Sequence, residues 1–258
     1  MRILITNDDG INAKGLETLH TIARGLSPDV WIVAPETNQS GTSHSLTLHT
    51  PLRLRTLDER TYAVAGTPTD CVIMAVRHIL KDGRPDLILS GVNHGSNLAE
   101  DITYSGTVAA AMEGALLGIK SIALSLMMSF EDGERRALWE TPLAHAPPLI
   151  TKLIQGRWKS GALLNVNFPD VPSADVAGVS VTSQGVRDQD LLKIDSRADP
   201  WGTPYFWFGF QRRKSTLVSG TDLAAMAEKK ISVTPLTLDL TDREAMAALQ
   251  KQLANPKK

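Results

Sequence analysis

The chain begins with Arg2-Ile3-Leu4-Ile5-Thr6-Asn7-Asp8-Asp9-Gly10, an apolar run that leads directly into two adjacent carboxylates. The apolar run is typical of a strand that is buried inside a parallel sheet. At contact distance and an effective dielectric of about 20, two like charges repel by about 4 kcal/mol, so Asp8 and Asp9 need a shared proton or a cation. Ligands of α/β proteins bind at the carboxyl ends of such strands. The stretch therefore predicts a parallel sheet with a cation site at its edge.

The same residues also have a purely structural interpretation. Asn-Asp-Asp-Gly is favourable turn chemistry, and an Asp before a helix is a good N-cap. The choice between the two interpretations depends on the rest of the chain.

Strand and helix patterns alternate along most of the sequence. Further strands are predicted over 30–34, 86–90, 121–126 and 163–168, and helices over 13–26, 67–80, 107–117 and 137–153, the last bent or interrupted at Pro147-Pro148. An antiparallel pair is predicted over 45–57 and 61–64, a short strand at Val233, and a final helix over 242–253. This alternation predicts an α/β fold with a Rossmann-like, doubly wound and mostly parallel sheet.

Aromatic residues are concentrated near the C-terminus. The segment 201–210 holds Trp201, Tyr205, Phe206, Trp207, Phe208 and Phe210. Such a run has no polar face for water, so it predicts a β-hairpin arm buried against another element or another subunit, with a plain core strand as the alternative. We therefore expect residues 1–175 to form the core. Residues 176–258 are expected to supply an arm, a closing strand and a terminal helix of the same domain, used in oligomerisation.

Composition narrows the functional classes. The 258 residues suffice for one large domain, and 27 Lys and Arg balance 28 Asp and Glu, which argues against bulk attraction to nucleic acid or acidic membranes. The single cysteine, Cys71, excludes an internal disulfide and a Cys-based zinc cluster. Asp8 and Asp9 interrupt the place of a secretion signal, and the apolar stretch 114–130 is broken by Lys120. We expect a cytoplasmic protein that neither associates with a membrane nor has a stable nucleic-acid partner.

Two further polar loops follow predicted strands. Residues 35–45 are dense in hydroxyl groups and include Ser40 and His44, and residues 90–97 include Asn93 and His94. Parallel strands bring such loops to one edge, where hard oxygen ligands suit Mg²⁺, Mn²⁺ or Ca²⁺ better than zinc or copper. The two histidines lack the paired spacing of metal ligands and are interpreted as substrate contacts or exposed side chains. Taken singly, each loop is also compatible with a simple connection.

The segment Ser105-Gly106-Thr107 precedes the Ala-rich helix. Ser105 and Thr107 are natural caps, and Gly106 allows a ligand close to the backbone. A helix N-terminus offers free N–H donors and the positive end of the dipole, so the segment is a candidate phosphate site. Ordinary helix capping is the alternative.

Five sequence blocks now stand in a fixed order. They are Ile3-Leu4-Ile5-Thr6-Asn7-Asp8-Asp9-Gly10, Val33-Ala34-Pro35 leading to Ser40 and Gly41, Gly66-Thr67-Pro68-Thr69-Asp70-Cys71, Ser90-Gly91-Val92-Asn93 and Tyr104-Ser105-Gly106-Thr107-Val108. In series they resemble the SurE family of stationary-phase survival proteins, which are metal-dependent 5′/3′-nucleotidases. The resemblance covers residues 1 to about 170, and the remainder fits the family's variable C-terminal arm more loosely.

The resemblance implies a Rossmann-like phosphomonoesterase, of 5′-nucleotidase type, that hydrolyses nucleoside 5′-monophosphates, and 3′-monophosphates as further candidates, to nucleoside and phosphate. It implies one divalent ion per subunit, Mg²⁺ or Mn²⁺ with Ca²⁺ as another occupant, and a homodimer or homotetramer with an exchanged arm. Its implied metal ligands are Asp8, Asp9, Ser40 and Asn93, of which the two aspartates are also catalytic. Its implied phosphate and substrate contacts are Asn97, Ser105, Gly106 and Thr107, with His44 and His94 as further candidates. Relatives often carry Arg where this chain has His94, a side chain that can be neutral.

Two other classes share part of this pattern. A non-enzymatic, receiver-like signalling module also binds Mg²⁺ through paired acids after its first strand, and it is the alternative function. It needs an acceptor Asp after the third strand, where this chain has Leu89-Ser90-Gly91-Val92-Asn93. A haloacid-type phosphatase needs Asp-x-Asp, which Asp8-Asp9-Gly10 does not supply.

Overall fold

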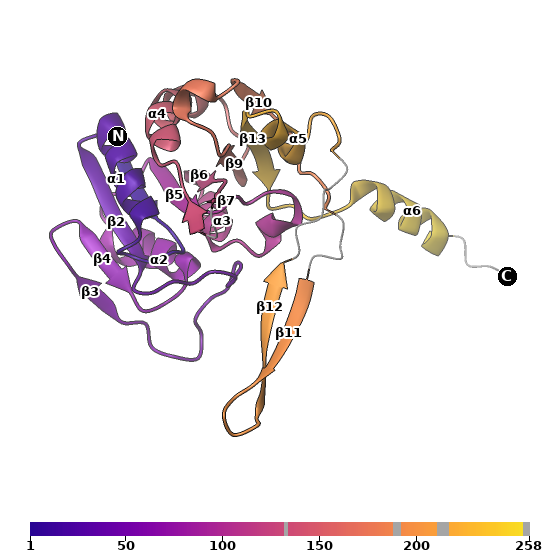
Figure 1. The fold of residues 1–258 in the computed structure, drawn as a ribbon. Coiled ribbons are helices and arrows are strands. Elements are labelled where there is room, and N and C mark those ends of the chain that lie inside the picture. The colour runs from indigo at the N-terminus through magenta and orange to yellow at the C-terminus, as the bar shows by residue number, and fades with distance from the viewer. Residues whose placement is uncertain (132–133, 188–191, 211–216, 255–258) are drawn as a thin grey trace.

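The structure is a computed structural model that describes residues 1–131, 134–187, 192–210 and 217–254. Within these ranges, nine strands form one sheet with helices on both of its faces (Figure 1). The strands are β1 (Arg2–Thr6), β2 (Asp29–Pro35), β3 (Leu54–Thr56), β4 (Thr61–Val64), β5 (Leu87–His94), β6 (Lys120–Leu126), β9 (Ala162–Phe168), β10 (Val179–Val181) and β13 (Ile231–Thr237). Two small antiparallel pairs join β7 (Ser129–Glu131) to β8 (Glu134–Arg136) and β11 (Leu192–Ala198) to β12 (Pro204–Phe210).

The helices alternate with these strands along the chain. They are α1 (Lys14–Leu26), α2 (Pro68–Met74) with its π-helical continuation η1 (Ala75–Ile79), α3 (Gly106–Leu116), α4 (Glu140–Gln155), α5 (Asp222–Ala227), α6 (Arg243–Ala254), and the 3₁₀ turns η2 (Ala99–Thr103) and η3 (Ser173–Asp175). No helix within the described ranges has both the length and the apolar character needed to cross a membrane.

The order of strands in the large sheet is β10-β13-β9-β6-β5-β1-β2-β4-β3. All neighbours are parallel except β3–β4 and β9–β13. From β1 the chain first continues to β2 on one side and later to β5 on the other, so the strand order reverses between β1 and β5. The α/β class with a mostly parallel sheet is confirmed, and this reversal is the place where such sheets bind ligands.

Strand β1 is buried on both faces because its side chains alternate between two helical layers. Ile3 and Ile5 belong to a core cluster with residues of α1 and α4, whereas Leu4 belongs to a cluster with residues of α2 and α3. Cys71 of α2 is buried in the second cluster. The continuous apolar run at the N-terminus is therefore explained by burial from both sides.

One expected strand boundary is wrong, and of the two expectations for Pro147-Pro148, an interruption or a bend, the interruption is wrong. The segment 45–57 pairs with β4 only over β3, because Leu46 and Leu48 are exposed and Thr47 is instead bonded to the Asp70 carboxylate. Helix α4 is not interrupted at Pro147-Pro148 but continues to Gln155. Its C-terminal half is held by buried residues such as Ile150, which compensates for the two missing N–H donors.

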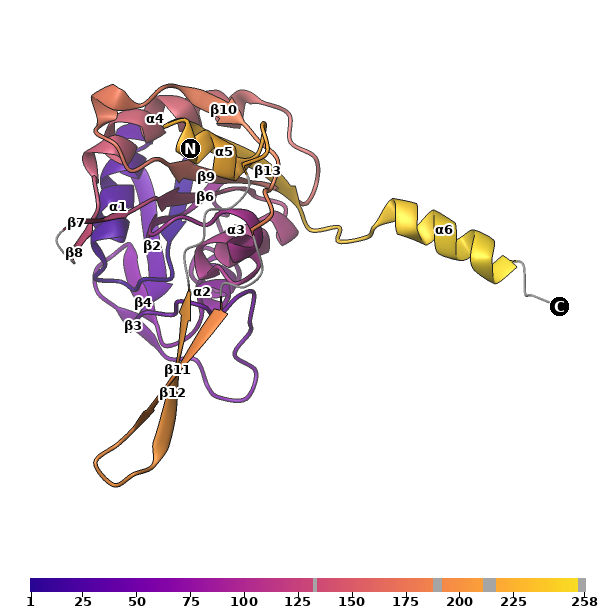
Figure 2. The ribbon, with the colours of Figure 1, turned by 45° about the vertical axis from the view of Figure 1, so that its right-hand side comes forward.

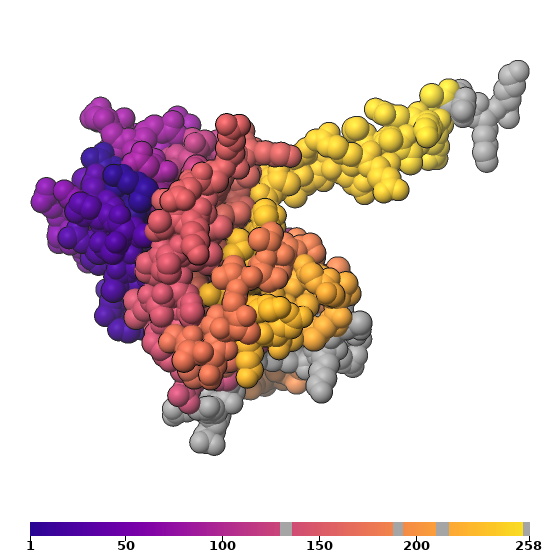
Figure 3. Space-filling view, turned by 90° about the horizontal axis from the view of Figure 1, so that it is seen from above, coloured from indigo at the N-terminus to yellow at the C-terminus, as the bar shows by residue number. Residues whose placement is uncertain are grey.

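The C-terminal part of the chain divides into inserted and projecting elements. Strand β13 lies between β9 and β10 in the sheet, whereas the β11–β12 hairpin and α6 project from the body (Figures 1 and 2). The view from above shows α6 reaching well beyond the remaining surface (Figure 3). Phe206, Trp207 and Phe208 of the hairpin are exposed in the single chain, so the core-strand alternative is wrong and the predicted hairpin is confirmed. Its burial against another subunit stays a prediction.

Candidate functional site

A tight turn after β1 presents the two carboxylates. The Asn7 side chain closes this turn, because its Oδ1 accepts from the Gly10 N–H at 3.2 Å and its Nδ2 donates to the Gly10 carbonyl at 2.9 Å. Gly10 has a φ of +105°, a conformation that side chains disfavour. Asp8 and Asp9 thus lie outside the strand, which ends at Thr6. Both carboxylates can therefore face the same side, which alternation along a strand would prevent.

Asp8 lies against the N-terminus of α3. Its Oδ1 accepts a hydrogen bond from the Thr107 hydroxyl at 2.5 Å. A Cβ added at Gly106 would be 2.7 Å from the Asp8 Cβ and 3.0 Å from its Oδ2, so only glycine permits this approach. The structure therefore brings the predicted cation site and the predicted phosphate segment into direct contact.

The Asp8 carboxyl is buried, and this controls its charge. The pKa of Asp8 is raised to about 6 as the net result of burial, which raises it most, the Thr107 hydrogen bond, which lowers it, and the negative charge of Asp9, which raises it. Without a positive partner, ionisation of Asp8 is therefore less favourable than that of an exposed aspartate. A cation beside Asp8 would stabilise the ionised form, as the adjacent carboxylates in the sequence suggest.

Asp9 is tied to the end of β5. Its Oδ2 accepts from the backbone N–H of His94 at 3.1 Å. Asn93 is half-buried beside this bond and donates its side-chain amide to the Gly95 carbonyl at 2.8 Å. The His94 ring stacks on Trp139, with 5.8 Å between ring centroids. The ends of β1 and β5 thus meet at the sheet edge, as the sequence predicts.

The loop that contains Ser40 reaches the same edge. The Gln39 N–H donates to the Asp8 carbonyl at 2.7 Å, which places the neighbouring Ser40 near the acidic turn. Ser40 is exposed, and its own N–H is bonded to Asn38. His44 instead contacts Glu113 of α3, with 3.1 Å between Nε2 and Oε2. The contacts of the described residues join neither the Ser40 nor the Asn93 side chain directly to a carboxylate.

Asn97 is held by side chains that the sequence analysis missed. Its N–H donates to Asn167 Oδ1 at 2.8 Å, and its carbonyl accepts from Asn165 Nδ2 at 2.8 Å and Asn167 Nδ2 at 3.1 Å. Its own Nδ2 donates to Ser125 Oγ at 2.8 Å. The available signal was two amides at alternate positions of an apolar strand, which share one face and need polar partners there.

The arrangement fits a hard divalent cation. Within the described part of the chain, no group of three His, Cys, Asp or Glu side chains could hold a metal ion. The predicted set needs only two carboxylates, with Ser40 and Asn93 as neutral oxygen donors. The Asp8 carboxyl is buried, and positive charge beside it would stabilise its ionised form. An oxygen-only donor set of this kind suits Mg²⁺ or Mn²⁺.

The fold and this site together define a doubly wound α/β protein with an acidic pair and a helix N-terminus at its switch point. Comparison with known proteins gives the family. The family model for "Survival protein SurE" matches residues 3–190, and the chain belongs to this family.

Relatives align over nearly the whole chain. A "5'-nucleotidase SurE" from Methylorubrum extorquens (strain PA1) is 59% identical over 243 residues, which cover 94% of this chain and 95% of the relative. A protein of the same description from Parvibaculum lavamentivorans is 54% identical over 261 residues, covering 100% of this chain and 94% of the relative. The crystal structure of the SurE protein from Aquifex aeolicus superposes with a TM-score of 0.83 at 38% identity, covering 99% of this chain and 100% of that chain.

Proposed function

We propose that the protein is a 5′-nucleotidase that hydrolyses nucleoside 5′-monophosphates to a nucleoside and phosphate, with 3′-monophosphates as further candidate substrates. The contact between Asp8 and Thr107 carries this proposal, because it joins an acidic site to a helix N-terminus suited to phosphate. The description of relatives at 54 to 59% identity as 5′-nucleotidases supports it.

We propose that Asp8, Asp9, Ser40 and Asn93 hold one divalent ion per subunit, Mg²⁺ or Mn²⁺, with Ca²⁺ as another occupant. When bound, such an ion neutralises charge on the phosphate and lowers the pKa of water. The Asp8 carboxylate is buried, and the hydrogen bond from the Thr107 hydroxyl fixes its orientation. Asp9 is less buried and has one oxygen bonded to His94, so it is the better placed of the two to orient the attacking water and accept its proton.

The start of α3 provides the donors for the phosphate. Ser105 Oγ accepts from the Val108 N–H at 3.1 Å, which leaves its own hydroxyl proton for a phosphate oxygen. The Thr107 hydroxyl proton is committed to Asp8, and the Thr107 backbone N–H also interacts with that carboxylate. Gly106 therefore contributes its backbone N–H, and Thr107 lies beside the phosphate as the partner of Asp8. Preorganised donors of this kind stabilise the charge that develops in the transition state.

We propose that the remaining predicted contacts bind other parts of the substrate. Asn97 donates one of its two side-chain N–H groups to Ser125 and keeps the second for substrate. We propose that His44, which contacts Glu113 of α3, and His94, whose N–H is bonded to Asp9, contact the rest of the nucleotide.

We also propose that residues 1–175 act as the catalytic core and that the arm, closing strand and terminal helix within 176–258 join subunits into a homodimer or homotetramer. The exposed aromatic side chains of the hairpin support this, because two strands alone cannot bury them. We propose a cytoplasmic location as well.

The test is a phosphate-release screen over nucleoside monophosphates, with Mg²⁺, with Mn²⁺ and with excess chelator. We expect turnover of 5′-monophosphates that requires a metal. Activity that is indifferent to the chelator would contradict the metal assignment. A stable phosphoprotein formed from acetyl phosphate, with no turnover of any nucleotide, would favour the signalling module instead.

A further inference from the structure

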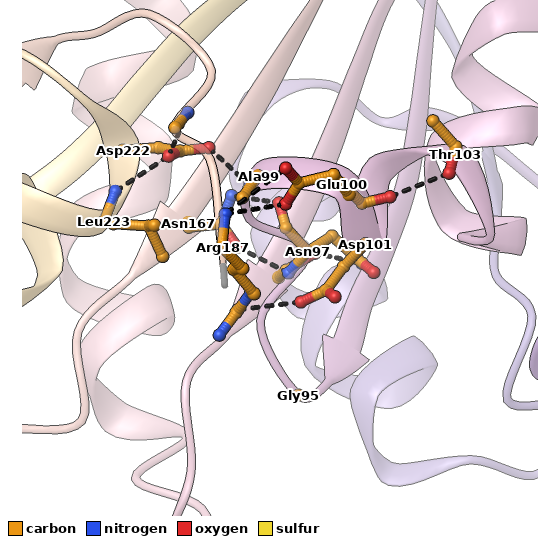
Figure 4. Close-up of polar contacts among 12 residues, drawn as sticks. Gly95, Asn97, Ala99, Glu100, Asp101, Thr103, Asn167, Arg187, Asp222 and Leu223 are labelled. Carbon is orange, nitrogen blue, oxygen red and sulfur yellow. Dashed lines mark hydrogen bonds and ion pairs between the residues drawn. The ribbon is translucent and has the colours of Figure 1, made fainter. Parts of the chain in front are cut away.

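A buried carboxylate far from the acidic pair holds three distant segments of the chain together. Asp222 lies at the start of α5 with no exposed surface. Its Oδ1 accepts from the N–H groups of Gly185 and Leu223, both at 2.8 Å, and its Oδ2 accepts from the Ala99 N–H at 2.9 Å (Figure 4). A buried charge with three N–H donors is well compensated, so these bonds are strong.

Ala99, which donates to Asp222, belongs to the loop that leads to α3. Ala99 has a φ of +52°, which side chains disfavour, so the surrounding structure must hold it in this conformation. Leu98 and Ala99 pack against Leu223 and Met226 of α5. The hydrogen bond from Asp222 and this apolar contact together fix the backbone at the start of η2.

A second connection joins the segment around Gly185 to the same loop. The Arg187 N–H donates to both Glu100 oxygens, at 2.9 and 3.2 Å, and its Nη2 donates to Asp101 Oδ2 at 2.8 Å (Figure 4). Gly185 comes so close to Asp222 that a Cβ there would lie 2.8 Å from Asp222 Oδ1. Asp222 thus positions Gly185, and Arg187 two residues later reaches η2.

The loop between residues 95 and 105 carries the proposed phosphate contacts at its two ends. Asn97 lies just before η2, and Ser105 caps α3 just after it. We propose that Asp222 is a positioning residue that holds this loop in the conformation that binds phosphate. The proposal rests on the proposed function for the identity of the phosphate contacts. Asp222 lies beyond residues 3–190, the part that the family model matches.

The test compares Asp222→Asn with Glu228→Gln, an exposed carboxylate at the end of the same helix. Asn keeps the size of Asp but turns one acceptor into a donor that faces an N–H. Titration with inorganic phosphate in the presence of Mn²⁺ should show that Asp222→Asn raises the dissociation constant for phosphate about tenfold or more. Steady-state kinetics with a nucleotide should show a similar rise in KM. Its affinity for Mn²⁺ should stay within about twofold of the wild type, because Asp8 and Asp9 are held by other contacts. Glu228→Gln should change none of these values.

A purely structural role would give a different result. Asp222→Asn would then unfold at a lower temperature but bind phosphate normally well below that temperature, and this outcome would overturn the proposal. If Asp222→Asn does not fold, Gly185→Ala provides the second variant, because its Cβ displaces the Asp222 carboxylate without removing the charge. Normal phosphate affinity in folded Gly185→Ala would equally overturn it.

Hydrogen exchange separates this proposal from the proposed function. Amides over residues 97–107 should exchange faster in Asp222→Asn than in the wild type or Glu228→Gln, whether or not the protein hydrolyses nucleotides. A wild-type protein without nucleotidase activity would end the proposed function alone. Unchanged exchange in this segment would end the positioning role alone.

Discussion

Phe168 and Phe208 each belong to an apolar-rich strand of seven residues, yet one is buried and the other is exposed. Phe168, at the end of β9, is fully buried in the main core, whereas Phe208 of β12 is 72% exposed. The body of the molecule buries apolar side chains between a sheet and helices on both faces. The hairpin has one strand pair and no covering layer in the single chain. An apolar pattern thus predicts that a side chain needs burial, but not whether its own chain provides it.

The largest expected effect would confirm that chemistry belongs to the body and not to the arm. Asp8→Asn or Asp9→Asn should lower nucleotidase turnover about 100-fold or more, because each removes charge from the proposed cation site. Steady-state phosphate release with Mn²⁺ measures this, with circular dichroism to verify folding. Asp82→Asn, at an exposed carboxylate before β5, is the control. Near-normal rates in both site variants would remove the proposed site.

The next effect tests the two phenylalanines directly. Phe168→Ala should lower the free energy of unfolding by about 3–5 kcal/mol, since it leaves a cavity in a packed core. Phe208→Ala should leave the stability of the dilute single chain within about 0.5 kcal/mol. It should instead raise the dissociation constant of the oligomer tenfold or more, because burial of the Phe208 side chain between subunits would contribute about 1.5–3 kcal/mol to the free energy of association. Urea unfolding and sedimentation velocity measure the two quantities. A wild-type protein that stays monomeric at high concentration would contradict the proposed role of the hairpin.

A smaller effect concerns pH in the metal-free protein. The pKa of Asp8 is about 6 in the folded chain against 3.8 as the ordinary value, so the folded state binds more protons between these pH values. Stability from this group is therefore present below pH 4 and is lost as the pH rises through 6, by up to about 3 kcal/mol. Urea unfolding with chelator at pH 5 and pH 7.5 should reveal the loss, and Asp8→Asn should abolish it. Identical pH slopes in wild type and variant would mean that Asp8 is not the group responsible.

The smallest effect compares helix caps in the two regions. Thr67 caps α2 inside the body, with its hydroxyl accepting from the Asp70 N–H, and Asp242 accepts from the Ala245 N–H at the start of α6. Thr67→Ala should lower the free energy of global unfolding by about 1 kcal/mol. Asp242→Ala should leave it unchanged, because α6 projects from the body. Equal losses in both variants would show that α6 unfolds together with the core.

Much of the body could be predicted from the sequence because local pattern and burial agree there. Strands β1, β2, β5, β6 and β9 are mainly apolar and largely buried, and the acidic turn and the start of α3 carry recognisable turn and cap residues. Strands β1 and β5 are parallel neighbours, so their carboxyl ends bring Asp8 and Asn93 to the same edge of the sheet, where Thr107 also lies. This arrangement follows from the general topology of such sheets.

Other parts of the site could not be predicted, because they depend on long-range partners. The supports of Asn97 come from Asn165 and Asn167 in β9, about seventy residues away along the chain. Asp222 reads locally as the first residue of a short helix, and only the fold brings it to Ala99 and Gly185. The continuation of α4 through its prolines likewise reflects tertiary packing that overrides local preference.

The insertion of β13 between β9 and β10 has a consequence for synthesis on the ribosome. One edge of β9 pairs with β13, which is translated only after the β11–β12 hairpin. A nascent chain that already contains the acidic turn and the start of α3 still exposes this strand edge until residues 231–237 leave the exit tunnel. Premature termination after β9 but before residues 231–237 would yield a protein with every proposed metal ligand and an open strand edge that favours aggregation.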